Sequence, residues 1–228
     1  LQHRVGNGHV YSSRHISDDE AAAALLANLP GEALADPRPL RFTAGRRKAV
    51  WAGNVIAIGL SRGFLEPLES TSIHLIQTGI ERLIDRLPQR RPGAAERAAF
   101  NADARAEMER VRDFIILHYW ANGRDEPFWR ERRGVPLPDS LAQRIALWRE
   151  AGRIVQQDRD LFTALAWQQV LVGQGVMPEA YHPLADLLSP ADRAAFIETT
   201  RKAVTGAAAR LPLHADFIAR HCPTGEVA

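Results

Sequence analysis

The spacing of hydrophobic residues separates a strand-like beginning of the chain from a helical remainder. In residues 72–87, apolar side chains recur every three or four positions, at Ile73, Ile76, Ile80, Leu83, Ile84 and Leu87. This spacing places them on one face of a helix. Residues 94–121 predict a long second helix that stops at Asn122-Gly123, and further helices are expected over residues 139–152, over residues 160–172 and from Pro190 onward.

The first third of the chain carries shorter patterns. Residues 8–12 and 40–43 predict short strands, and the nearly unbroken apolar run within residues 49–60 predicts a longer, largely buried strand. Ser17 and Glu20 have the spacing of a capping box, so a helix is expected behind them until Pro30-Gly31. The expected fold class is therefore α+β, predominantly α, with a small strand-containing part over residues 1–70 and a mainly helical part over residues 71–228.

The composition indicates an ordinary globular protein. Of 228 residues, 46% are hydrophobic and 25% are charged, and 29 Lys and Arg residues face 27 Asp and Glu residues. The cations alternate with acids instead of forming one patch, which argues against a nucleic-acid partner. No apolar run approaches the ~20 residues of a membrane span, so a cytoplasmic location without membrane contact is expected. The single cysteine, Cys222, excludes an internal disulfide. The chain opens without Met, which suggests a piece of a longer protein.

Common catalytic motifs are weak or missing. The Gly6-x-Gly8 and Gly173-x-Gly175 pairs lack the third glycine of a dinucleotide fingerprint, and the histidines lack the spacing of metal ligands, so no metal is expected. Residues 59–63 match Gly-x-Ser-x-Gly, but a proline loop follows where a hydrolase needs a helix. A serine hydrolase is therefore disfavoured.

Residues 51–77 carry the most informative pattern. A strand is followed by a loop rich in Gly and Pro, and then by a helix that starts near Thr71. Free backbone N–H groups at a helix start attract an anion, and Glu69 lies just ahead of them. Functional residues concentrate in such loops, but from the residues alone helix capping by Glu69 and Ser70 is the favoured interpretation, because it is the commoner role of such residues.

Four segments resemble the flavin-dependent tryptophan halogenases. The most specific is Glu66-Pro67-Leu68-Glu69-Ser70-Thr71-Ser72-Ile73, preceded by Gly53-Asn54 and Ile58-Gly59-Leu60. The opening residues 1–13 and the segments Arg112–Tyr119 and Arg124–Arg130 are also similar to this family. The resemblance covers most of the chain and corresponds to the C-terminal portion of such an enzyme, with residues 1–70 as the last piece of the FAD-binding part.

The resemblance implies a chemistry and a set of residues. In the family, FADH2 from a separate flavin reductase reacts with O2, and the flavin hydroperoxide oxidises a halide to hypohalous acid, which then halogenates tryptophan or another aromatic substrate. It implies that Glu69 is catalytic and contacts the substrate, that backbone N–H groups at Thr71 and Ser72 hold the halide, and that Leu60 and Ile73 contact FAD.

The resemblance also implies a substrate site. Aromatic residues that sandwich an indole map onto His118, Tyr119, Phe128 and Trp129, with Asp125 or Glu126 available for an amino group. Tyr119 and Phe128 could instead be core residues, and the interval between the two aromatic pairs is one residue shorter than in many relatives.

Several family features do not occur in this sequence. The glycine-rich FAD fingerprint, the catalytic lysine and the Trp-x-Trp-x-Ile-Pro motif are all missing, and Lys48 lies outside the lysine motif. The chain alone is therefore expected to be inactive. Two other functions remain open: a non-catalytic helical binding module, and a hydroxylase resembling flavin monooxygenases. A homodimer is possible by analogy with relatives.

Overall fold

The computed structural model describes residues 5–157 and 160–222. Two compact units divide them: residues 40–181 form one, and the described residues before Leu40 and after Tyr181 form the other. Leu1–Arg4, which carry part of the family resemblance, lie outside the described residues. The predicted boundary after residue 70 stays a prediction.

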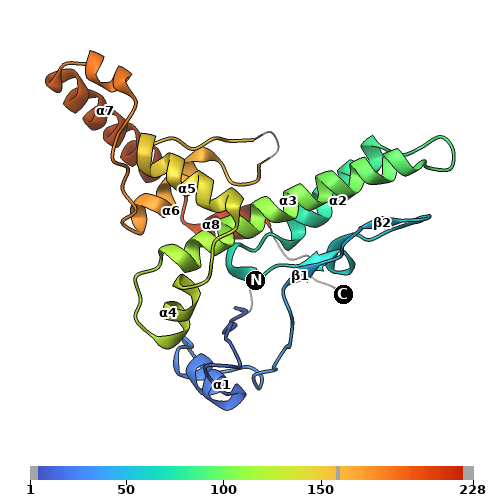
Figure 1. Cartoon of the computed structure of the whole chain (residues 1–228). Coiled ribbons are helices and arrows are strands. Elements are labelled where there is room, and N and C mark those ends of the chain that lie inside the picture. The colour runs from blue at the N-terminus through green and yellow to red at the C-terminus, as the bar shows by residue number, and fades with distance from the viewer. Residues whose placement is uncertain (1–4, 158–159, 223–228) are drawn as a thin grey trace. The chain divides into compact units, whose positions relative to one another are not determined.

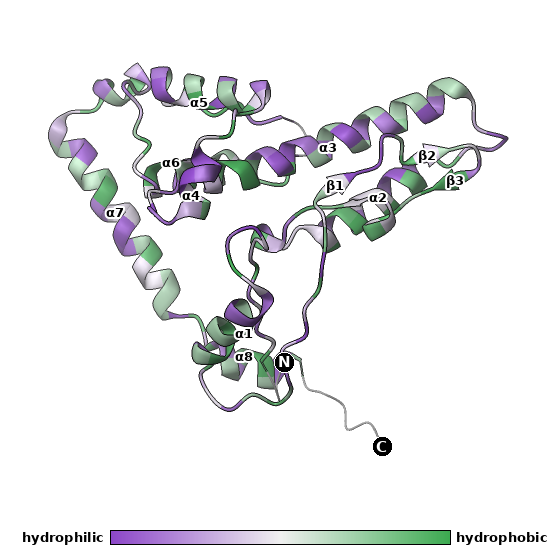
Figure 2. Ribbon diagram, turned by 60° about the horizontal axis from the view of Figure 1, so that its bottom comes forward, coloured by the Kyte–Doolittle hydropathy of each residue, from purple (hydrophilic) through white to green (hydrophobic). Residues whose placement is uncertain are grey.

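The unit of residues 40–181 is built around one long helix, α3 (Ala94–Ala121), with α2 (Ser72–Asp85) beside it (Figures 1 and 2). Leu75 of α2 packs against Met108, Val111 and Ile115 of α3. A larger cluster joins α3 to α5 (Asp139–Ala151) and α6 (Ala164–Gly173); its buried members are Phe114, Leu117, Leu141, Ile145, Trp148, Trp167 and Leu171. The core of this unit is therefore an assembly of helices around α3.

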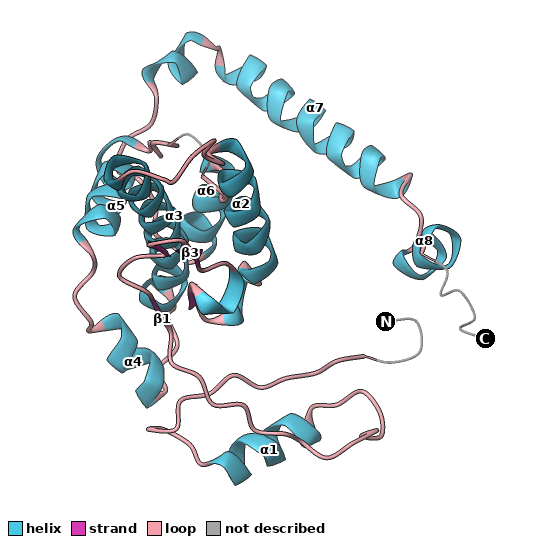
Figure 3. Cartoon of the chain, turned by 90° about the vertical axis from the view of Figure 1, so that its right-hand side faces the viewer, coloured by secondary structure: helices cyan, strands magenta, loops and turns pink. Residues whose placement is uncertain are grey.

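Strands are few and short in the described chain (Figure 3). Strand β1 (Gly45–Arg46) pairs antiparallel with β4 (Gly63–Phe64), and β2 (Trp51–Ala52) pairs with β3 (Val55–Ile56). The predicted strand over residues 49–60 was wrong, because Gly53 has a φ of 59° and turns the chain back on itself. The 3₁₀ turn η1 (Gly59–Ser61) follows. Residues 40–43 are not a strand either, since no described strand pairs with them.

The second unit contains α1 (Asp18–Ala27), the turn η3 (Pro183–Leu187), α7 (Pro190–Ala209) and α8 (His214–His221). The predicted capping box is confirmed, with the Ser17 side chain accepting from the Glu20 N–H. Residues 8–12 are not a strand; the Tyr11 hydroxyl donates to Asp18 at 2.6 Å, so side-chain bonds to α1 replace a strand ladder. Ala21 is the one buried hydrophobic residue among the described residues of this unit.

The predicted helices are largely confirmed, as is the mainly helical fold class. The predicted helix over residues 160–172 begins later, at α6, because the Thr163 hydroxyl caps its first turn while Asp160 forms an ion pair with Arg110. Two short helices were not predicted: α4 (Pro127–Arg133) and α8.

Helix α2, coloured by hydropathy in Figure 2, exposes most of its predicted apolar positions in the described chain. Its exposed members are Ile73, Ile80, Ile84 and Leu87. The face that α2 buries lies beside them and carries Leu75, Gly79 and Arg82. We call the exposed set the α2 stripe.

Candidate active site

The site residues gather on the loop between β4 and α2. Pro67 opens the 3₁₀ turn η2 (Pro67–Glu69), because its ring fixes φ in the helical range and its missing N–H is not needed there. Ser70 closes the turn with its N–H donating to the Pro67 carbonyl at 3.1 Å. Glu69 therefore projects from the last position of a rigid turn, directly ahead of α2.

The backbone at residues 70–72 has the alternating conformation of an N–H nest. Ser70 is left-handed (φ 52°, ψ 37°), the one non-glycine residue with positive φ in the described chain, and Thr71 is right-handed helical (φ −79°, ψ −8°). Consecutive residues of opposite hand turn their N–H groups into one concavity, which binds anions. The Thr71 side chain makes no capping bond, and Thr71 is buried. The N–H groups of Thr71 and Ser72 can therefore hold a halide, at the start of a helix dipole that favours negative charge.

Glu69 is held by the long helix. Its Oε1 lies 2.9 Å from Nε2 of His118 on α3. The second ring nitrogen of His118, Nδ1, lies 2.8 Å from the Phe114 carbonyl oxygen. The Glu69 carboxylate is 29% exposed, so it is both fixed and reachable by a substrate.

Glu66 is held by the next residue of the same helix. The Tyr119 hydroxyl donates a short hydrogen bond to Glu66 Oε2. Burial, together with this bond to the carboxylate, raises the pKa of Tyr119 well above its ordinary value, so the hydroxyl stays protonated. Glu66 was not predicted as a site residue, although its spacing of three residues from Glu69 places both carboxylates on one side of a turn.

Aromatic rings adjoin this pair of carboxylates. Trp129 of α4 stacks on Tyr119 with ring centroids 5.6 Å apart, and Phe128 meets Tyr119 edge to face at 5.9 Å. All three side chains are half-buried. Asp125 points elsewhere: its side chain is 90% exposed and pairs with Arg133 at 3.4 Å. The structure thus pairs Glu69 with His118 and joins Glu66 to Tyr119 and its neighbouring rings, and it leaves Asp125 outside both sets.

The two residues assigned to FAD lie on neighbouring elements. Leu60 of η1 and Ile73 of α2 are 71% and 78% exposed. Their elements pack closely, because a Cβ on Gly59 would lie 3.2 Å from Ile76. Exposed aliphatic side chains beside free backbone N–H groups fit one face of a flavin ring, which is apolar with a polar edge. Leu60 and Ile73 are therefore suited to contact the ring of a flavin and not its phosphates.

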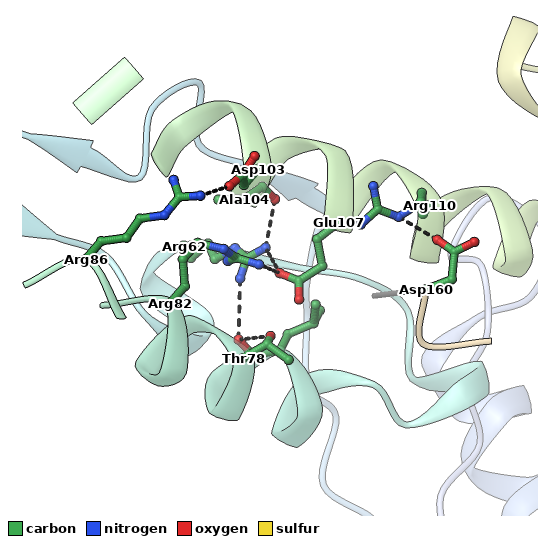
Figure 4. Close-up of polar contacts among 10 residues, drawn as sticks. Arg62, Thr78, Arg82, Arg86, Asp103, Ala104, Glu107, Arg110 and Asp160 are labelled. Atoms are coloured by element: carbon green, nitrogen blue, oxygen red, sulfur yellow. Dashed lines mark hydrogen bonds and ion pairs between the residues drawn. The ribbon is translucent and has the colours of Figure 1, made fainter. Parts of the chain in front are cut away.

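A buried ion cluster fixes η1 against the helices (Figure 4). Arg62, directly after η1, donates to Glu107 Oε2 of α3 at 2.7 Å and to the Ala104 carbonyl at 2.8 Å. Arg82 of α2 reaches the same oxygen at 3.1 Å. Burial alone would raise the pKa of Glu107, but hydrogen bonds from Thr78 and Arg62 and the charges of the two arginines outweigh it, so the pKa is lowered. The cluster thereby ties the flavin-side loop to α2 and α3.

Comparison with known proteins identifies the family. The family model described as "Tryptophan halogenase" matches residues 1–190. The chain belongs to the tryptophan halogenase family. Its fold matches the solved structure of Xcc4156, a flavin-dependent halogenase from Xanthomonas campestris, with a TM-score of 0.90 and 47% identity over 94% of this chain. It also matches BrvH, a flavin-dependent halogenase from Brevundimonas sp. BAL3, with a TM-score of 0.87 and 46% identity over 92% of this chain.

Halogenases named for tryptophan are also similar in sequence. The 7-chloro-L-tryptophan 6-halogenase KtzR from Kutzneria sp. (strain 744) is 38% identical over 147 residues. The match covers 64% of this chain and 28% of KtzR, and the two solved structures are covered to 44% and 43% of their lengths. The chain therefore spans less than half the length of these relatives. Within the described residues, no helix is long and apolar enough to cross a membrane.

Proposed function

We propose that this chain forms the halide- and substrate-side portion of a flavin-dependent halogenase that acts on tryptophan or another indole-like arene. The observation that carries the proposal is the backbone nest at residues 70–72 immediately beside a held carboxylate, Glu69. An anion and a carboxylate repel each other, so side by side they serve different steps. The nest holds the halide, and Glu69 serves the arene.

Each group has a defined task in this proposal. FAD, delivered reduced by a flavin reductase and reacting with O2, would supply the oxidising equivalents that convert halide to an electrophilic halogen. The N–H groups of Thr71 and Ser72 retain the halide, and Leu60 and Ile73 contact the flavin ring. When the carbon–halogen bond forms on the arene, the ring must lose a proton from that carbon, and Glu69 accepts it. Atoms and charge then balance, with the proton on Glu69 and the aromatic ring restored.

The aromatic residues explain the proposed substrate class. Tyr119, Phe128 and Trp129 offer ring faces and edges to an electron-rich arene and keep water from a reactive halogen species. Asp125, bound to Arg133, is not needed for an arene without an amino group. Indole is therefore the first substrate to test and tryptophan the second. A homodimer and a separate flavin reductase as partners remain part of the proposal.

The test uses the chain together with a flavin-binding portion. The chain is joined in its natural order to the flavin-binding portion that its relatives have, and incubated with FAD, a flavin reductase, NADH, O2, bromide or chloride, and indole. We expect halide-dependent formation of haloindole, detected by mass spectrometry. Hydroxylated indole formed equally well without halide would instead indicate a hydroxylase. Indole binding without turnover, while the flavin is reoxidised normally, would indicate a binding module.

A further inference from the structure

His118 is fixed at both edges of its ring. Nδ1 lies 2.8 Å from the Phe114 carbonyl oxygen and Nε2 lies 2.9 Å from Glu69 Oε1. The ring also packs edge to face on Phe114, with centroids 4.9 Å apart. An imidazole held in this way cannot turn to stack on a substrate without breaking both polar contacts.

The polar partners of the His118 ring indicate which of its nitrogens carries a proton. A carbonyl oxygen can only accept, so Nδ1 carries a proton. An ionised carboxylate can also only accept, so a proton on Nε2 makes the contact with Glu69 Oε1 an ion pair.

We propose that His118 is the positioning residue of Glu69. Its Nε2, when protonated, pairs with Oε1 at 2.9 Å and so leaves Oε2, which has no hydrogen-bond partner among the described residues, to accept the proton of the arene. This proposal rests on the proposed function. It assigns His118 to Glu69 and not to the wall of the substrate site.

The surrounding charges do not compete for the ring. On the η2 side, Glu66 is bound by Tyr119, and on the α4 side the charge of Arg132 acts on Tyr119. One turn before His118 on α3, Asp113 is bound by Arg112 and by the Ser140 hydroxyl of α5. Glu69 is therefore the acidic partner of His118.

Three substitutions separate the functions of the ring. In His118→Gln, the amide can donate to Glu69 without a charge. His118→Asn can donate to the Phe114 carbonyl but is too short to reach Glu69. His118→Phe retains the ring and loses both polar contacts. His214→Phe, at an exposed position of α8, is the matched control.

The first measurement needs no activity. Nitrogen-15 NMR of the 228-residue chain, with labelled histidine, reports the protons of His118. We expect Nδ1 to be protonated at every pH at which the chain is folded, and we expect Glu69→Gln to change the Nε2 signal, because the new amide can donate to a neutral Nε2. A bare Nδ1, or an Nε2 signal that ignores Glu69→Gln, would overturn the proposal.

The second measurement is kinetic and uses the chain joined to the flavin-binding portion. We expect His118→Phe and His118→Asn to lower kcat about tenfold, with KM for indole changed less than about twofold, and His118→Gln to recover most of kcat. A rise in KM alone would make His118 a substrate contact, and unchanged kcat in His118→Phe would remove it from the mechanism. If the wild type makes no haloindole, the proposed function fails. The NMR result still decides whether His118 pairs with Glu69.

Discussion

Glu69 derives its proposed role from its surroundings. A carboxylate at the end of a 3₁₀ turn, with its side chain 29% exposed and 2.9 Å from His118, contributes little to the buried core. Glu69→Gln preserves the shape and can still hydrogen-bond but cannot accept a proton at the arene. We expect turnover in the joined protein to fall by about 10²-fold or more, with folding and FAD binding unchanged. Steady-state haloindole formation measures the first effect and thermal melting the second.

A control for this substitution lies on α2. Glu81 is exposed and accepts a hydrogen bond from Gln77, away from the site. Glu81→Gln should leave turnover unchanged. Near-normal halogenation by Glu69→Gln at equal expression would remove Glu69 from the chemistry.

Ser70 gives a second prediction for single residues, because the nest depends on its left-handed backbone. Glycine adopts φ near 52° without cost, whereas a β-branched residue is strained there. We expect Ser70→Gly to keep halide affinity, and Ser70→Val to raise the KM for chloride about tenfold by disturbing the N–H groups of Thr71 and Ser72. The chloride dependence of initial rates is the measurement. Equal chloride dependence in the two variants would mean that the nest does not bind halide.

Only part of the site could be predicted from the sequence. Residues 69–73 could be placed together because a helix start concentrates free N–H groups, and the family resemblance added the roles. The contacts of Glu69 with His118 and of Glu66 with Tyr119 join residues 49 and 53 positions apart, and no local pattern encodes such a distance. The left-handed Ser70 was also not predicted, since serine seldom adopts this conformation.

Among the elements, helices were predicted well and strands poorly, for a physical reason. Helices α2, α3 and α5 carry their own signals in periodic apolar positions and end residues. The strands depend on partners: the apolar run at residues 55–58 suits a buried strand equally well, but the Gly53-Asn54 turn folds it into a short hairpin. Similarly, periodicity identified the α2 stripe, but it could not show that α3 packs on the neighbouring face.

The ion cluster that joins η1, α2 and α3 yields a prediction for these elements. Glu107→Gln would leave the buried guanidinium groups of Arg62 and Arg82 without a counter-charge. We expect the free energy of unfolding at neutral pH to fall by about 3–5 kcal/mol. Urea unfolding followed by circular dichroism measures it. A matched control is Glu109→Gln on the same helix, whose partner Arg46 is partly exposed; it should cost less than about 1 kcal/mol.

The same cluster predicts a pH dependence. Because the pKa of Glu107 is lower in the folded chain than its ordinary value of 4.5, its contribution to stability is present above that value and disappears as the pH falls through the folded pKa. The stability difference between wild type and Glu107→Gln should therefore shrink on acidification. A difference that stays constant down to about pH 3 would show that the charge of Glu107 does not act in this way.

At the scale of the whole molecule, the proposed flavin contacts lie on the surface of the described chain and not in a hollow. The site residues Leu60, Glu69 and Ile73 line neither of two hollows found in this unit. Leu60 and Ile73 are instead 71% and 78% exposed. The proposed flavin contacts therefore form one open wall, which shares Ile73 with the α2 stripe.

The last prediction follows from this open wall. The 228-residue chain by itself should bind FAD with a Kd no tighter than about 1 mM, because each charge-assisted phosphate contact that a flavin site normally makes is worth about 1.5–3 kcal/mol and the proposed contacts reach only the ring. Riboflavin, which has no phosphates, should bind equally weakly. The affinities of the chain for FAD and for riboflavin are both measured by flavin fluorescence. Adding the separately expressed flavin-binding portion of the joined protein should restore FAD binding.

Stoichiometric FAD in the purified chain would contradict the prediction. FAD binding far tighter than riboflavin binding would point to a phosphate site in the chain, for which the hollow lined by Arg46, Arg47, Lys48 and Arg105 would be the first place to test by substitution.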